Sequence, residues 1–455
     1  MTPSVSSLYF ALPVWAQNAL LSAYGATLHI RRYGGVHREV LASLLESQFW
    51  SAAELETLQL TRLRELVAHA STVPYYRKLG LHGLRIDRLE QLRQLPTTSK
   101  SELRAHPLEM RSEAFRSTEL LQIHTGGTTG TPLTVYCHRA ALQRNYAFFS
   151  RLRAWAKVPA RARVATFAGR TIVAADQATA PYWRRHAFAN TMLFSSYHIG
   201  LTTVPQYVEE LARWKPQLID SYPSSLEPIA RFVVEQQVTG IRPIAVITSS
   251  ETLSGQVRAL ISSAFQAPVF DHYGSAEMAA FVSQCEHGTY HVNPEFGIVE
   301  LLQNDRSVGA GEVGEIVATG FINPVMPLIR YRTGDLAVWG DADCACGRRF
   351  PVIEQIVGRL DDVVLTPDGR RIGRLDPIFK AVSSFYEARI VQDAVDHVRV
   401  EYVAESDLGD DERAKLVREL RNRLGSGMRI DVRRVSSIPR TARGKLRTVV
   451  SELGG

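Results

Sequence analysis

Lysine is scarce in this chain of 455 residues, which holds seven lysines against 46 arginines. A lysine in a glycine-flanked loop is therefore harder to explain as an ordinary solvent-exposed residue here than in a lysine-rich protein. Cysteine is scarce too, and the four thiols are too few and too unevenly spaced for a disulfide framework. The remaining composition, with 45% apolar and 22% charged residues, is that of an ordinary globular protein.

Runs of basic residues are also missing. The formal charge of +7 comes from scattered side chains, so the sequence predicts no nucleic-acid partner, and a phosphate-bearing substrate explains the surplus equally well. The apolar stretch 8–28 contains Gln17, Asn18 and Ser22 and follows no basic segment, so it predicts neither a signal peptide nor a membrane span. We expect a buried or interfacial helix there, in a cytoplasmic protein that is a monomer or homodimer.

Helical and strand-like segments alternate through the first part of the chain. Ser51 with Glu54 and Ser224 with Glu227 form capping-box patterns before apolar residues at helical spacing. Short apolar runs at 164–168 and 244–248 predict buried strands between such helices, which indicates an α/β core. Residues 296–302 and 315–319 are strand-like and flank a polar turn, so we expect a β-rich subdomain after the α/β part.

A separate unit follows Gly358. Residues 390–402 are strand-like, 410–424 form an amphipathic helix, and 430–435 are strand-like again. The sequence thus predicts a fold of the α/β class, with a large N-terminal domain over residues 1–360 and a small α+β C-terminal domain over residues 361–455.

The strongest local motif is a loop of glycine and threonine at residues 124–132. Its glycines allow tight turns with exposed backbone N–H groups, and its threonine hydroxyls add further donors, so the loop can cradle phosphate oxygens. No Gly-Lys-Ser/Thr sequence follows, which excludes a Walker loop. A flexible polar hairpin is the alternative explanation. The predicted phosphate-binding residues are Thr125, Gly126, Gly127, Thr128, Thr129 and Gly130.

A second motif, residues 271–277, directly follows an apolar run. The Tyr273 ring can stack on a base, Gly274 permits close approach of the ligand, and the Glu277 carboxylate can hold Mg²⁺ against phosphates. Further along, Asp335 follows a tight turn and can accept both hydroxyls of a ribose. Near the C-terminus, Lys445 lies in a glycine-containing loop, where its charge can stabilise the charge that develops on the α-phosphate of ATP. Taken singly, each of these is also compatible with an ordinary turn.

Together, these motifs resemble the adenylate-forming superfamily in their order and separation. The resemblance spans residues 121–446 and implies the adenylate-forming enzyme fold, with ATP and Mg²⁺ as cofactors. It implies that Tyr273 lies beside adenine, that Asp335 holds the ribose, that Arg359 contacts ribose or phosphate, and that Asp361 is the hinge. Lys445 matches the adenylation lysine, and we predict Lys445, Glu277 and Thr128 as the catalytic residues.

Within the superfamily, the chain is most similar to phenylacetate–CoA ligases and to the capsule-biosynthesis adenylating proteins of the CapK-like branch. The segments that carry this likeness are residues 73–77, 194–198, 220–224 and 326–330. One departure is that Leu133 follows Pro132, where many members of the superfamily have lysine. Because this branch often lacks that lysine, we expect the departure to affect ATP affinity more than the class of reaction.

Three of the four cysteines form a separate constellation. Cys285 stands in a Cys-Glu-His-Gly-Thr-Tyr-His sequence, and Cys344 and Cys346 follow some sixty residues later. Three thiolates with one imidazole make a tetrahedral zinc set, and a fully protein-filled set is structural rather than catalytic. We predict His291 as the fourth ligand, with His287 as the alternative, and free buried cysteines as the competing explanation. Cys137 is assigned to packing.

The predicted reaction has two halves, formation of an acyl-adenylate from a carboxylic acid and ATP, and transfer of the acyl group to an acceptor. Coenzyme A is the acceptor that the resemblance favours, while an amine or hydroxyl acceptor stays open. A non-catalytic nucleotide- or zinc-binding scaffold needs no adenylation lysine, and a lysyl-adenylate nucleic-acid ligase needs a Lys-x-Asp-Gly motif that is absent. An aryl or other apolar acid is favoured by the candidate pocket residues Phe148, Tyr197, His198, Tyr222 and Ala280.

Overall fold

The computed structural model describes residues 8–81, 83–125, 133–174, 176–200, 202–251, 253–341, 343–357, 364–372, 375, 378–379, 382, 384–385, 387–439 and 449–453. None of the helices in these ranges has the length and apolar character needed to cross a membrane.

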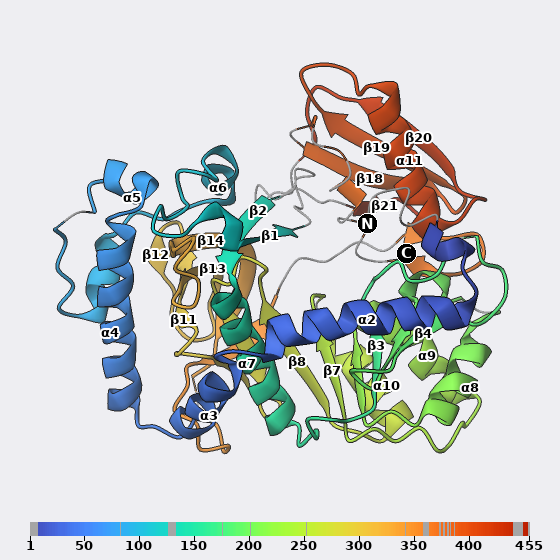
Figure 1. The fold of residues 1–455 in the computed structure, drawn as a ribbon, viewed down its shortest axis with the longest axis horizontal. Coiled ribbons are helices and arrows are strands. Elements are labelled where there is room, and N and C mark those ends of the chain that lie inside the picture. Colours follow the sequence, from blue (N-terminus) through green and yellow to red (C-terminus); the bar gives the residue numbers. More distant parts are fainter. Residues whose placement is uncertain are drawn as a thin grey trace.

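A mixed sheet of 13 strands runs through the centre of the large N-terminal part (Figure 1). Five neighbouring strands are parallel, and β4 adds an antiparallel strand at the edge. The predicted strands 164–168 and 244–248 are β3 and β7, and they read as short apolar runs because helices cover both of their faces. The parallel strands and this edge strand are β3 (Val164–Phe167), β5 (Thr191–Phe194), β6 (Leu218–Ser221), β7 (Ala245–Ser249), β8 (Val269–Gly274) and β4 (Trp183–His186).

The β-rich part continues the same sheet instead of forming a second one. Strand β9 pairs antiparallel with β8, and the remaining strands extend the sheet as antiparallel neighbours. The predicted strands at 296–302 and 315–319 are β11 and β13, which pair with each other. The antiparallel strands are β9 (Phe281–Gln284), β10 (Tyr290–Val292), β11 (Gly297–Gln303), β12 (Arg306–Ser307), β13 (Val313–Gly320), β14 (Leu328–Trp339) and β15 (Val352–Ile356).

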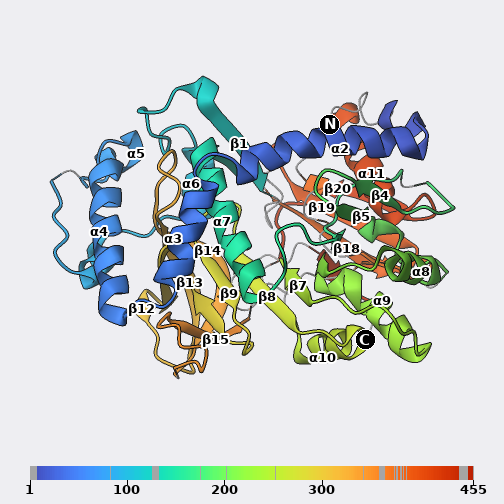
Figure 2. The ribbon, with the colours of Figure 1, turned by 60° about the horizontal axis from the view of Figure 1, so that its bottom comes forward.

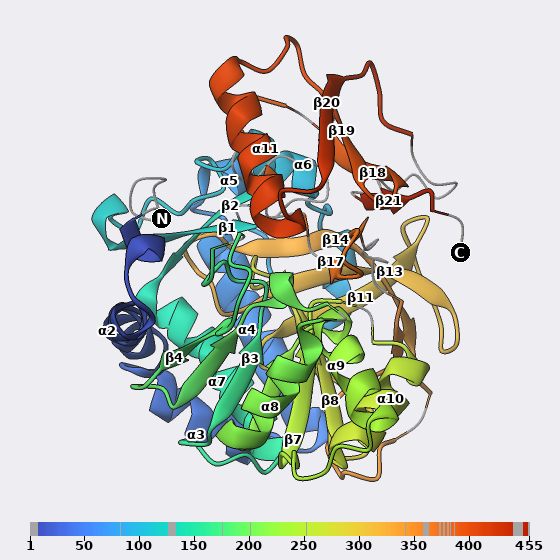
Figure 3. The same ribbon diagram turned by 90° about the vertical axis from the view of Figure 1, so that its right-hand side faces the viewer.

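Helices cover the parallel half of the sheet on both faces (Figures 2 and 3). Helices α2 (Val14–Tyr33), α3 (His37–Ser47) and α7 (Arg139–Trp155) lie on one face, and α8 (Val204–Trp214), α9 (Pro223–Glu235) and α10 (Gly255–Phe265) lie on the other. The other described helices are α4 (Ala52–Ala70), α5 (Pro74–Lys78) and α6 (Lys100–Ala105), with short 3-10 helices at Leu89–Gln94, Ser117–Glu119 and Ser196–His198.

The two predicted capping boxes differ in outcome. The capping box of Ser51 and Glu54 is confirmed at the start of α4. The box at Ser224 is wrong, because α9 begins at Pro223 and the Ser224 hydroxyl instead donates to Glu251 at 2.9 Å. The apolar stretch at 8–28 does form most of α2, but the helix is not buried: its Trp15 side chain is 73% exposed.

The C-terminal residues form a four-stranded sheet with strand order β20-β19-β18-β21, which packs beside α11 (Asp410–Leu424). The predicted single strand 390–402 is wrong: it is an antiparallel hairpin of β18 (Glu387–Ala394) and β19 (His397–Val403), which turns at Val395 and Asp396. The predicted strand 430–435 is β20 (Arg429–Arg434), and β21 is Val449–Ser451. Two short strands, β16 (Val364–Leu365) and β17 (Arg371–Ile372), precede this sheet. In Figure 1 this unit stands above the parallel half of the large sheet.

Candidate active site and candidate zinc centre

The carboxyl ends of the parallel strands meet along one edge of the sheet. Strand β8 begins with the buried residues Val269 and Phe270 and ends at Tyr273 and Gly274. Because its first half is anchored in the core, the strand places the end of the motif at the carboxyl edge. In an open α/β sheet, ligands bind outside the carboxyl ends of the strands. The second predicted motif therefore lies where this fold class places its ligands.

Tyr273 and Asp335 meet across the sheet although 62 residues separate them in the chain. The Tyr273 hydroxyl donates a hydrogen bond to Asp335 Oδ2 at 3.0 Å. Asp335 lies in β14 directly after Gly334, whose φ of 73° is in the left-handed region that favours glycine. Burial raises the pKa of Tyr273 well above its ordinary value, and the neighbouring Asp335 and Glu277 carboxylates raise it further. The hydroxyl therefore stays protonated and acts as a donor.

Glu277 is a buried carboxylate at the same edge, with 6% of the residue exposed. The Tyr331 hydroxyl donates to Glu277 Oε1 at 3.1 Å. Within the described ranges, no arginine, lysine or histidine forms an ion pair with this carboxylate. A buried carboxylate without a cationic partner is costly unless a cation compensates it, so Glu277 fits a Mg²⁺ ligand.

The phosphate-binding loop is framed by a hairpin. Strands β1 (Leu120–Thr125) and β2 (Leu133–His138) pair antiparallel and bring Thr125 opposite Leu133. Thr125 ends β1, whereas the predicted residues Gly126, Gly127, Thr128, Thr129 and Gly130 lie outside the described residues. The same holds for Arg359, Asp361 and Lys445.

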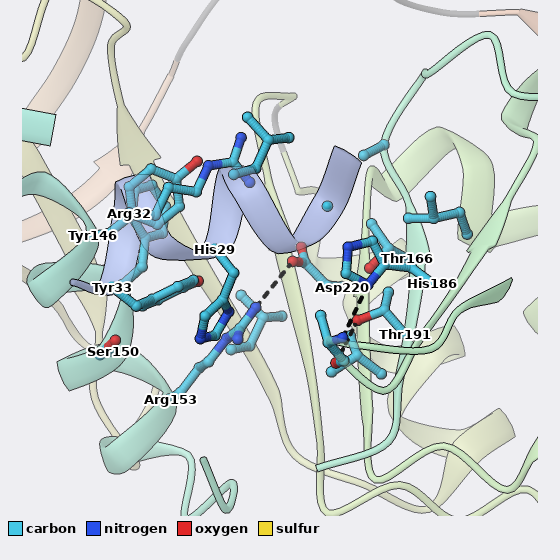
Figure 4. A pocket seen from close by; sticks show the side chains of 18 of the residues that line it. His29, Arg32, Tyr33, Tyr146, Ser150, Arg153, Thr166, His186, Thr191 and Asp220 are labelled. Carbon is cyan, nitrogen blue, oxygen red and sulfur yellow. Dashed lines mark hydrogen bonds and ion pairs between the residues drawn. The ribbon is translucent and has the colours of Figure 1, made fainter. Parts of the chain in front are cut away.

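A cavity of about 1340 Å³ opens between α2, α7 and the carboxyl edge of the parallel strands (Figure 4). Residues that follow four of these strands line it, which connects the cavity to the edge that carries Tyr273. These residues are Ala168, Tyr222, Ser250 and Ser275.

Of the five candidate pocket residues, Tyr222 lines this cavity and the other four are buried elsewhere. The Tyr197 ring packs with the apolar core of the C-terminal unit, and the Arg423 guanidinium lies 5.7 Å from its centroid. His198 hydrogen-bonds Ser195 Oγ at 2.7 Å and the carbonyl of Ala174 at 3.0 Å. Phe148 and Ala280 belong to two separate apolar clusters of the core.

Sequence reasoning missed most of the polar residues around the cavity. His29, Arg32 and Tyr33 come from α2, and Tyr146 and Arg153 come from α7 (Figure 4). None of them belongs to a recognisable motif. The missed signal was the mixed character of the stretch around residues 24–33, in which aromatic and basic residues recur at helical spacing.

A second cluster holds the four predicted zinc ligands. One ligand atom from each of Cys285, His291, Cys344 and Cys346 lies within 4.8 Å of the others. Cys285 Sγ is 3.6 Å from Cys344 Sγ, and Cys346 Sγ is 3.4 Å from His291 Nε2. His287, the alternative ligand, is exposed, and its backbone N–H donates to Cys285 Sγ at 3.4 Å.

The chemistry of this cluster suits zinc. Burial lowers the pKa of His291 to about 4, so its imidazole is neutral at pH 7, as a metal ligand must be. Burial raises the pKa of the Cys285 thiol to about 12, so without a cation nearby this thiol stays protonated. Three sulfurs and one imidazole nitrogen make a closed tetrahedral set. None of the four residues lines the cavity, so a metal here would be structural.

Comparison with known proteins agrees with the motifs. Residues 364–452 match the family model described as the CapK C-terminal domain. Over 98% of its length the chain is 25% identical to CapK of Staphylococcus aureus, and the match covers 99% of that protein. The predicted resemblance is confirmed. The phenylacetate-coenzyme A ligases of Thermus thermophilus and Escherichia coli are 26% and 24% identical over 69% of the chain, and the matches cover 72% and 73% of those enzymes.

Solved structures show the same fold. The crystal structure of 2-hydroxyisobutyryl-CoA ligase in complex with 2-HIB-AMP and CoA, in the thioesterification state, has a TM-score of 0.58 at 22% identity. The match covers 89% of this chain and 91% of that one. A post-adenylation structure of that ligase gives a TM-score of 0.55. The predicted adenylate-forming fold is confirmed by these matches.

Proposed function

We propose that this protein activates a carboxylic acid with ATP and transfers the resulting acyl group to the thiol of coenzyme A. The observation that carries the proposal is the convergence of Tyr273, Glu277 and Asp335, from two motifs far apart in the chain, at the edge of the sheet beside the cavity. The relatives named as phenylacetate-coenzyme A ligases support the same reaction class. We assign residues 1–360 to ATP and acid binding and 361–455 to a mobile C-terminal domain.

In the first half-reaction, a carboxylate oxygen of the acid attacks the α-phosphorus of ATP, and the bond to the β-phosphate oxygen breaks. Acyl-adenylate and pyrophosphate are the products. Tyr273 and Asp335 hold the nucleoside, and the Thr125–Gly130 loop holds the leaving phosphates. When bound at Glu277, Mg²⁺ neutralises phosphate charge. Lys445 stabilises the negative charge that builds on the α-phosphate in the transition state.

In the second half-reaction, the thiol sulfur attacks the acyl carbon, and AMP leaves as the carbon–oxygen bond to its phosphate breaks. The C-terminal domain turns about Asp361 between the two halves, which removes Lys445 and admits the acceptor. Keeping both steps within one closed site protects the mixed anhydride from water. The acid is an aryl or other apolar acid, because Tyr33, Tyr146 and Phe149 line the cavity.

An amine or hydroxyl acceptor is the second candidate. The similarity to CapK covers 98% of the chain, against 69% for the phenylacetate-coenzyme A ligases. Residues 364–452, which match the CapK model, lie in the proposed domain that admits the acceptor. The acceptor therefore need not be the one that the phenylacetate-coenzyme A ligases use.

An acid-dependent ATP–pyrophosphate exchange screen tests the first half-reaction. We expect exchange with a subset of aromatic acids and none without acid. Mass analysis after addition of coenzyme A, amines or hydroxyl compounds then identifies the acceptor. ATP binding without exchange for any acid in a broad panel would instead support a nucleotide-binding scaffold.

A further inference from the structure

The cavity carries an excess of positive charge. Four arginines line it, namely Arg32, Arg153, Arg161 and Arg170, whereas Asp220 is the one acidic side chain among its described lining residues. An apolar acid uses one negative charge, and adenylation converts that carboxylate into an anhydride. A simple aryl acid therefore offers no second anion for the remaining positive charge.

Three of these arginines act electrostatically on Tyr146. The Arg32 guanidinium lies 4.7 Å from the centroid of the Tyr146 ring. Burial raises the pKa of the Tyr146 hydroxyl, and Arg32, Arg170 and Arg153 each act to lower it. The three arginines come from separate segments: α2, α7 and the loop after β3. Figure 4 shows Arg32 on α2 and Arg153 on α7.

The carboxylates of the protein neutralise only part of this charge. Arg153 contacts Asp220 Oδ2 at 3.7 Å, and Arg170 adds to the positive field that partly offsets the raised pKa of the half-buried Asp220 carboxyl. Among the described residues, neither Arg32 nor Arg170 has an ion-pair partner. Arg32 is half-buried, so solvent compensates its charge incompletely, whereas the exposed Arg170 remains in contact with solvent.

We infer that Arg32, Arg153 and Arg170 form a second anion-binding subsite, and that the substrate is an aromatic acid with a second negatively charged group. The inference rests on the proposed function. The guanidinium groups bind the second anion, a carboxylate or phosphate, through charge-assisted hydrogen bonds. The rings of Tyr33 and Tyr146 pack against the aromatic body of the acid, and the other carboxylate points toward the strand edge at Ser275. The size of the cavity agrees with a substrate larger than a simple aryl acid, because its volume of about 1340 Å³ exceeds the usual range of roughly 300–1,000 Å³ for ligand pockets.

Calorimetric titration of the whole protein without ATP tests the subsite independently of catalysis. The probes are pairs of aromatic acids of increasing length in which a second carboxylate is replaced by a carboxamide, starting with 4-carboxyphenylacetate and 4-carbamoylphenylacetate. Phosphate-substituted analogues form a second arm that separates carboxylate from phosphate recognition. We expect at least one dianion to bind roughly tenfold to a hundredfold more tightly than its neutral-substituted partner.

Arg32→Gln and Arg170→Gln should move that affinity ratio toward one. Arg153 is left unchanged because its replacement would remove the ion pair with the half-buried Asp220. Arg62→Gln removes the same charge from an exposed site on α4 and should leave the ratio unaltered. Equal affinities within every pair, absence of binding by every dianion, or an unchanged ratio in both cavity variants would overturn the inference. Dianion preference without pyrophosphate exchange would keep the subsite and reject the proposed activity.

Discussion

The Tyr273 hydroxyl donates to Asp335 at 3.0 Å and so joins the two motifs that we assign to adenine and ribose. Asp335→Ala should raise the KM for ATP because it removes the proposed ribose acceptor. Tyr273→Phe keeps the ring and loses the hydrogen bond to Asp335, worth roughly 0.5–1.5 kcal/mol, so loss of that bond should weaken ATP binding by about tenfold at most. Titration with a non-hydrolysable ATP analogue measures the nucleotide affinity of both variants. If the double variant is no weaker than Asp335→Ala alone, the hydroxyl acts through the carboxylate.

Lys445 lies outside the described residues, and its role follows from the sequence motif. Lys445→Ala should slow pyrophosphate exchange by roughly 10²–10³, because one positioned cation is lost from the first transition state. Transfer from preformed acyl-adenylate should be largely unaffected. Lys78→Ala, at an exposed lysine on α5, is the control. Exchange at the wild-type rate would remove Lys445 from the mechanism.

Glu277→Gln separates charge from hydrogen bonding. The glutamine carbonyl can still accept from Tyr331, so the fold should persist, while the charge that would hold Mg²⁺ is lost. We expect the variant to need a higher Mg²⁺ concentration for ATP–pyrophosphate exchange and to catalyse that exchange more slowly than the wild type. Glu65→Gln, on the exposed side of α4, should behave as the wild type. Unaltered metal dependence and turnover would exclude Glu277 from the site.

Elements with a strong local signal could be predicted from the sequence. Residues 410–424 have apolar residues at helical spacing and acidic residues at the start, and the structure places α11 at those bounds. The hairpin of β18 and β19 was missed because Val395 and Asp396 carry no glycine or proline turn signal in an otherwise strand-like run. The cap at Ser224 was misassigned because Glu251, 27 residues later, binds the hydroxyl.

The residues of the candidate sites likewise fall into those that a local sequence pattern identifies and those that it does not. Tyr273, Glu277 and Asp335 belong to contiguous motifs and could be found by pattern, and Cys285, Cys344 and Cys346 stood out because cysteine is rare. Arg32 could not be identified by a sequence pattern, because its position at the cavity depends on where α2 crosses the sheet. Tyr197 belongs to one of the segments that carry the family likeness, but its side chain packs against the C-terminal core. No local sequence pattern reveals this packing.

Asp271 should make stability depend on pH. Burial raises the pKa of this carboxyl to about 6, although Thr248 and Tyr290 both hydrogen-bond it. An unfolded aspartate titrates near 3.9, so between about pH 4 and pH 6 the native state binds more protons, and stability falls as pH rises. The contribution is on the order of 3 kcal/mol at most.

Asp271→Asn should remove this part of the pH dependence. Denaturant unfolding at pH values from 4 to 7 measures it, and Asp87→Asn, at an exposed carboxylate, should retain the wild-type slope. An unchanged slope in Asp271→Asn would show that other groups cause the dependence.

The last prediction concerns the cluster of Cys285, His291, Cys344 and Cys346. Purified protein should carry about one Zn²⁺ per chain. Because all four positions are filled by protein, no bound water is left to activate, and the metal should join the β9–β10 hairpin to the loop before β15 without entering the acyl chemistry. Cys344→Ser or a chelator should remove the metal and lower the melting temperature by roughly 5 °C or more. Pyrophosphate exchange per folded molecule should change little.

Cys137→Ser is the matched control, since Cys137 is buried outside the cluster and should leave the zinc content at one. His287→Ala should also retain the metal, whereas His291→Ala should lose it, because the His291 ring lies 3.4 Å from Cys346 Sγ and His287 is exposed. Metal analysis that finds no zinc in protein purified without chelator would leave the cysteines as packing residues. Loss of exchange in step with loss of zinc, at temperatures where the fold persists, would instead assign the metal a part in catalysis.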